Sequence, residues 1–154
     1  MRTGSTLELD TSLWPIVVST PHGAISDGDL QRLFDTFDSF WKRGEMFVTV
    51  SNMTSSRDVS ARQRQMVGEW LKKNKTSIQR YSAGGVLIVD SALLRGALTA
   101  IGWVYQAPLD MSYVKDWTEA TDTALARLAK VGISEPGLRA RMLEFGKQRA
   151  ANAS

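Results

Sequence analysis

Short apolar runs alternate along the chain with longer segments in which apolar residues recur every three or four positions. The first pattern is typical of buried strands, and the second predicts amphipathic helices. The predicted strands are residues 7–10, 15–20, 46–50, 86–89 and 111–114. Helices are predicted to follow caps at Ser26, Asp58 or Ser60, Asp90 or Ser91, Asp116 or Thr118, and Ser134.

The segment after Ser26 carries the clearest helix signal. Asp29 stands where a capping box places an acid, and Gly44 supplies a left-handed stop. The helix after the loop at residues 51–58 is predicted to run from about Ser60 to Gln79, and the last helix from 135 to 149. The glycine pair at 84–85 is predicted to break the chain just before a strand.

The order of elements, ββαβαβαβαα, indicates the fold class. Apolar strands that alternate with amphipathic helices predict an α/β fold with a mostly parallel four- to five-stranded sheet and helices packed on it. We expect one domain over residues 1–154, with a core at 7–131 and an additional C-terminal helix at 132–150. The residues predicted to be largely buried are Phe34, Phe37, Trp41, Trp70, Leu87 and Ile101.

Composition excludes several classes of site. The chain has no cysteine, so it has no disulfide framework, no thiolate metal site and no cysteine nucleophile. Its N-terminus lacks the apolar run of an export signal, and no apolar stretch approaches the roughly 20 residues of a membrane span. These observations predict a cytoplasmic protein that does not insert into a membrane.

Charge is unevenly distributed. Residues 1–58 carry 5 basic and 8 acidic side chains, whereas residues 59–154 carry 14 basic and 8 acidic ones. A basic cluster of this kind can neutralise phosphates. No aromatic residues interleave with it as a stacking platform for bases, so a solvated helix face is favoured over a nucleic-acid site.

Catalytic and cofactor motifs are missing. His22 is the single histidine, and it has no nucleophile or orienting acid at a recognisable spacing. Neither GxxxxGK[ST] nor GxGxxG occurs, and the acidic pairs look like a helix start and a solvated face. We therefore predict no enzyme activity, no cofactor and no metal site.

The segment 51–58 is the most distinctive loop. Four hydroxyl residues are followed by an arginine and an aspartate just before a helix N-terminus, where the helix dipole favours phosphate. Local chemistry alone favours turn and capping roles for these residues. Ser55 and Ser56 are the candidate phosphorylation sites.

Residues 47–56 (FVTVSNMTSS) and 85–89 (GVLIV), in this element order, resemble the STAS domains of anti-sigma-factor antagonists and the SpoIIAA-like domains. In that family a phosphorylatable serine lies in the loop after this strand, in an Asp-Ser pair. Here Ser55-Ser56 stands in that place. The resemblance implies a bacterial regulatory or scaffolding module that docks another protein through loop 51–58 and the helix after it.

Three functions follow from these patterns. The leading one is a non-catalytic signalling module whose protein partner is a regulatory kinase, a small GTPase or another signalling protein. Its candidate partner-binding residues are Thr54, Arg57, Arg62 and Arg64. The alternative is a small-ligand or lipid-binding domain with an apolar pocket around Trp14, Trp103 and Met111, and a third is an enzyme centred on His22. Self-association is open in each case.

Overall fold

The structure, a computed structural model, describes residues 6–55, 59–104 and 110–153. Its strands are β1 (Thr6–Asp10), β2 (Ile16–His22), β3 (Phe47–Asn52), β4 (Ser82–Ile88) and β5 (Met111–Val114). Its helices are α1 (Asp27–Trp41), α2 (Ala61–Lys73), α3 (Lys75–Tyr81), α4 (Ala92–Val104), α5 (Trp117–Lys130) and α6 (Leu138–Ala153).

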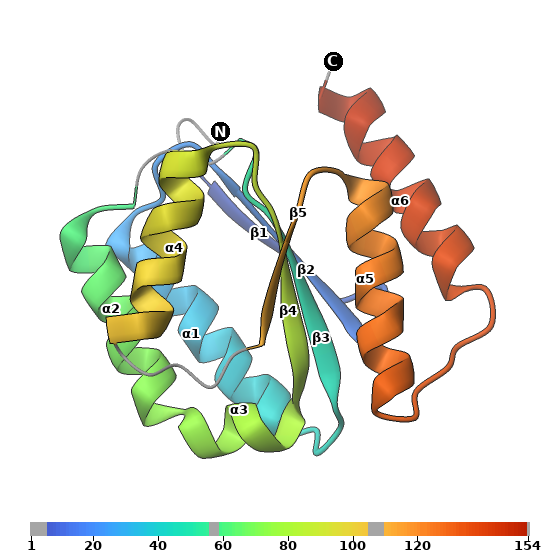
Figure 1. Ribbon diagram of the computed structural model, residues 1–154, viewed down its shortest axis with the longest axis horizontal. Helices are drawn as coiled ribbons and strands as arrows, with labels where there is room; N and C mark the ends of the chain where they lie inside the picture. Colours follow the sequence, from blue (N-terminus) through green and yellow to red (C-terminus); the bar gives the residue numbers. More distant parts are fainter. Residues whose placement is uncertain (1–5, 56–58, 105–109, 154) are drawn as a thin grey trace.

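The strands form one sheet in the order β1-β2-β3-β4-β5, with β1 antiparallel to β2 and the other neighbours parallel. This confirms the predicted α/β class and the mostly parallel sheet. Each crossover steps in the same direction across the sheet, and right-handed crossovers then place their helices on one face. Accordingly α1 to α4 cover one face, and α5 and α6 cover the other (Figure 1).

The main core lies on the face covered by α5 and α6. The strands contribute β-branched side chains there, of which Val48, Val50 and Val86 are completely buried. Helix α6 belongs to the same cluster, because Leu138 and Met142 are at most 1% exposed. The predicted C-terminal helix therefore supplies side chains to the central core.

Three predicted details were wrong. The predicted helix 60–79 is two helices, separated at Asn74, whose side-chain amide donates to the Trp70 carbonyl at 2.9 Å. Gly84 and Gly85 lie inside β4 rather than before it, and Arg127 crosses directly over Gly84. The last helix begins at Leu138, because Gly137 adopts a positive φ of 81°.

Burial of the predicted core residues is uneven. Phe34, Leu87 and Ile101 are buried, at 6–8% exposure. Three aromatic side chains on the α1–α4 face are only partly buried, namely Phe37, Trp41 and Trp70. The sequence pattern correctly put these rings on an inward face, but that face is less tightly filled than the opposite one.

Candidate functional site

The loops at the carboxyl ends of β2, β3 and β4 are tied to one another. The Gly23 amide donates to the Ser55 carbonyl at 2.8 Å, which joins the loops after β2 and β3. The Met53 amide donates to the Ile88 carbonyl at 3.0 Å, which holds the start of the β3 loop against β4. Ligands of open α/β sheets gather at this edge. The described part of the predicted docking loop, residues 51–55, is thus part of a braced surface.

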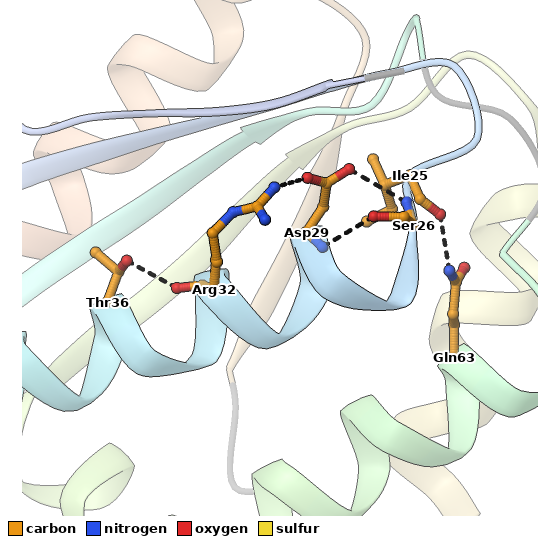
Figure 2. Close-up of polar contacts among 6 residues, drawn as sticks. All are labelled: Ile25, Ser26, Asp29, Arg32, Thr36 and Gln63. Carbon is orange, nitrogen blue, oxygen red and sulfur yellow. Dashed lines mark hydrogen bonds and ion pairs between the residues drawn. The ribbon is translucent and has the colours of Figure 1, made fainter. Parts of the chain in front are cut away.

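Helix α2 is fastened to the start of α1 by a buried glutamine. The Gln63 side-chain amide donates to the Ile25 carbonyl at 2.8 Å (Figure 2) and to Asp27 Oδ1 at 3.1 Å. Ser60 caps the helix, accepting from the Gln63 amide at 3.1 Å. Because Gln63 is 7% exposed, its amide would lose hydrogen bonds if the two helices separated.

The start of α1 is itself capped in both directions. The Asp29 amide donates to Ser26 Oγ at 3.0 Å, and the Ser26 amide donates back to Asp29 Oδ2 at 3.2 Å (Figure 2). The Ser26 backbone N–H is the largest cause that lowers the pKa of Asp29, opposed by burial and assisted by the Ser26 side chain and Arg32. The predicted capping box is confirmed.

The predicted partner-binding residues differ in how available they are. Thr54 is exposed, and its amide and hydroxyl both donate to Asn52 Oδ1, at 3.2 and 2.7 Å. The Arg62 side chain is 78% exposed and places Nε 3.0 Å from Asp27 Oδ2. Arg64 is partly buried and donates from Nη1 to the Val59 carbonyl at 2.7 Å. Arg64 therefore braces its own helix.

Of the two candidate phosphorylation sites, only Ser55 lies among the described residues. Ser55 is exposed, and its carbonyl accepts from Gly23. Ser56 and Arg57 lie outside the described residues. Their roles stay predictions from the sequence.

Leu93 adds an apolar group to the same edge. It lies in the first turn of α4, just after the carboxyl end of β4, and is 77% exposed. The Ser91 hydroxyl accepts from the Leu94 amide at 3.2 Å, so Ser91 caps this turn. Of the described residues, the only other large hydrophobic residue classed as exposed is Val131, which lies next to the end of α5.

A cavity of about 590 Å³ lies between the sheet and helices α1, α2 and α4. Met111 lines it, as the small-ligand alternative expected. Trp14 does not, because it packs on Phe40 and Phe47 beneath Arg43. The side chain of Trp103 lies outside the described part of the structure. A cavity is present, but two of the three residues proposed to line it are not shown to do so.

The described residues contain no assembled catalytic or metal-binding group. His22 ends β2 with Nε2 3.9 Å from Glu8 Oε1, and no hydroxyl nucleophile in the described ranges hydrogen-bonds to it. Within the same ranges, no three His, Asp or Glu side chains come together to hold a metal ion. None of the described helices is long and apolar enough to span a membrane.

The sequence reasoning missed two groups of residues. Gln63 lies in the polar first turn of its helix, where only its position three residues after the Ser60 cap indicated a role. Ser19 and Thr49 were treated as ordinary strand residues, and Ser51 as the first residue of the loop at 51–58. Their signal was available, because they occupy alternate positions in strands that are otherwise apolar and β-branched.

Comparison with known proteins agrees with this architecture. One similar solved structure is an uncharacterized protein of the DUF3478 family from Shewanella loihica PV-4, which has a SpoIIAA-like fold. The TM-score is 0.57 and the sequence identity is 13%, and the comparison covers 80% of this chain and 98% of that one. The chain has a SpoIIAA-like fold. An anti-sigma factor antagonist from Mycobacterium paratuberculosis is also similar, with a TM-score of 0.49 and 10% identity over 79% of this chain and 94% of that one. No protein-family model and no curated protein matches the sequence.

Proposed function

We propose that the protein is a non-catalytic regulatory module that binds another protein at the carboxyl edge of its sheet. The single observation that supports this most is the bracing of that edge. Its loops are joined by backbone hydrogen bonds, and Gln63 joins α2 to the loop before α1. Side chains mounted on a rigid loop bind a partner without a large cost of ordering.

The edge offers both polar and apolar contacts to a partner. Arg62 uses Nε toward Asp27, and a guanidinium has five N–H donors, so it can bind a partner carboxylate as well. Thr54 adds a hydroxyl, and Leu93 adds an exposed aliphatic group. A partner suited to this surface presents carboxylates around an apolar depression, as a regulatory kinase or another signalling protein can. The SpoIIAA-like fold is compatible with this role but does not determine it.

Site-specific photo-cross-linking tests the proposal. A benzophenone amino acid at Thr54 or at Leu93 is expected to capture one and the same protein in the source cells. The same group at Val131, which is 38% exposed, is the matched control and should not capture it. Capture at Val131 but at neither edge position would contradict the proposal.

A further inference from the structure

The two faces of the sheet carry different kinds of side chain. On the α5/α6 face, neighbouring strands place valines side by side at 18, 50 and 86. On the α1–α4 face, one register row is Val17–Thr49–Gly85–Met111 and the next is Ser19–Ser51–Leu87–Tyr113. The middle of this second face therefore carries short side chains. Short side chains on the sheet leave space beneath the helices, and this is the origin of the cavity.

The opposite wall of the cavity is apolar and partly aromatic. Helix α1 contributes Phe34, helix α2 contributes Trp70, and helix α4 contributes Ile101, among others. Phe34 and Trp70 stack nearly parallel, with ring centroids 5.0 Å apart. A volume of 590 Å³ would hold roughly twenty water molecules at about 30 Å³ each, and this wall offers them few hydrogen bonds. It lies in the size range of sites for small organic ligands.

The floor of the cavity carries hydroxyl groups without partners. Ser19, Thr49 and Ser51 line the cavity, and their side chains make no hydrogen bond to any residue that the structure describes. Ser19 is only 8% exposed. None of the three oxygens is among the completely enclosed side-chain atoms that lack a partner, so they are open to the cavity, where an occupant that supplies hydrogen bonds can take the place of water.

Charge limits the kind of occupant. Among the described lining residues there is no lysine, arginine or histidine, and the arginines that contact lining residues are already engaged, Arg127 with Asp110 and Arg95 over the Tyr113 ring. An ionised carboxylate or phosphate inside the cavity would therefore have no lining counter-ion. Asp110 is the one carboxyl group among them, with a side chain that is 73% exposed. Arg127 lies 2.7 Å from it and lowers the pKa of Asp110, and because the two opposite charges form an ion pair, this group adds no net positive charge that would attract an anion.

From these observations we propose that the cavity is a binding site for an uncharged, mostly apolar molecule with one hydroxyl or carbonyl group that meets Ser19, Thr49 and Ser51. Long-chain alcohols and other neutral lipids have this chemistry. Fatty-acid anions and phosphorylated lipids do not. The site adjoins the proposed docking edge, because α2, α4 and Ser51, the first residue of segment 51–58, contribute to both.

Displacement of an uncharged fluorescent dye, N-phenyl-1-naphthylamine, from the full chain tests the proposal. We expect the dye to bind, 1-decanol to displace it, and decanoate at pH 8 to require at least about tenfold more ligand. In the double variant Ser19→Ala/Ser51→Ala, decanol should bind about three- to tenfold more weakly while dye affinity changes less than twofold. Thr36→Val, which removes a hydroxyl outside the cavity, is the matched control and should change neither.

A filling substitution locates the binding. Ser51→Leu should occupy the cavity and abolish binding of both dye and decanol, while the protein still melts cooperatively. Equal displacement by decanoate would overturn the uncharged class, and unchanged decanol affinity in the serine variant would overturn the hydroxyl contacts. Absence of dye binding to the wild type, or dye binding that survives in a folded Ser51→Leu variant, would overturn the site itself.

Discussion

Gly146 of α6 lies against the indole of Trp117 of α5, so closely that a Cβ atom at position 146 would come within 2.3 Å of the ring. The indole Nε1 also donates to the Met142 carbonyl at 2.6 Å. Glycine thus permits the close approach of α5 and α6, and the hydrogen bond fixes its geometry. The last helix is fastened by this contact and by the burial of Leu138 and Met142.

Gly146→Ala is therefore expected to destabilise the protein. Alanine usually favours a helix over glycine, but here its methyl group would force the indole out of place, at a cost of about 1–3 kcal/mol. The matched control is Gly96→Ala in α4, where an added Cβ would meet no atom within 4 Å apart from its chain neighbours and the backbone of its own helix, and a gain of about 0.5–1 kcal/mol is expected. Urea denaturation of both variants checks the opposite signs. Equal effects would show that the contact with Trp117 is not tight.

The second prediction compares the stability contributions of the indole N–H groups of Trp117 and Trp41. Trp117 has a partner for its indole N–H, whereas the Nε1 atom of Trp41 is buried without a partner in the described structure. Trp117→Phe loses the hydrogen bond that the indole donates to the Met142 carbonyl, while Trp41→Phe removes a group that is already unpaired. We expect Trp117→Phe to cost about 1–2 kcal/mol more, measured by denaturant unfolding. A larger loss for Trp41→Phe would mean that its N–H has a partner in solution.

Asp29 makes stability depend on pH. The folded protein lowers the pKa of Asp29, chiefly through the Ser26 backbone N–H, so the ionised carboxylate stabilises the fold. This contribution is complete well above the unfolded pKa of about 4 and is lost as the pH falls through the lower folded pKa. Asp29→Asn should lower the unfolding free energy at pH 7 and flatten its decline in acid.

Ser60→Ala is the control for this pH effect. It removes a cap from α2 that involves no carboxylate, so its loss of about 1 kcal/mol should be the same at pH 7 and pH 3. Unfolding midpoints in urea at both pH values make the comparison. If Asp29→Asn were as insensitive to pH as Ser60→Ala, the capping carboxylate would not be the group that titrates.

Much of the fold could be predicted because its signals are local. The strands read as β-branched runs, and the Ser26–Asp29 capping box marked the start of α1. The break at Asn74 could not be read, because lysines and polar residues continue on both sides of it and the apolar spacing does not stop. Gly84 looked like a turn residue because the partner that requires it, Arg127, is 43 positions away in the chain.

The candidate site was less predictable for the same reason. Arg62 and Arg64 look equivalent in the sequence, yet Arg62 points to Asp27 at the surface and Arg64 binds its own helix start. The cavity depends on a register that sets Ser19 beside Ser51 and Thr49 beside Gly85. Periodicity shows which residues share a face of one strand, but it does not show which strands are neighbours.

The docking edge leads to the last prediction, which compares Arg62→Glu with Arg139→Glu. Both arginines are exposed and lie 3.0 and 2.9 Å from one aspartate each, Asp27 and Asp122. An exposed ion pair contributes only about 0–1 kcal/mol, so both variants should melt within a few degrees of the wild type. Only Arg62 lies at the carboxyl edge of the sheet, so only Arg62→Glu is expected to weaken the partner captured there by more than about 1 kcal/mol in titration calorimetry. Arg57→Glu is predicted to do the same, and Ser55→Asp or Ser56→Asp to change the affinity if that loop is a phosphorylation switch. Should Arg139→Glu weaken binding while Arg62→Glu leaves it unchanged, the partner binds α6, and the proposed docking surface is wrong.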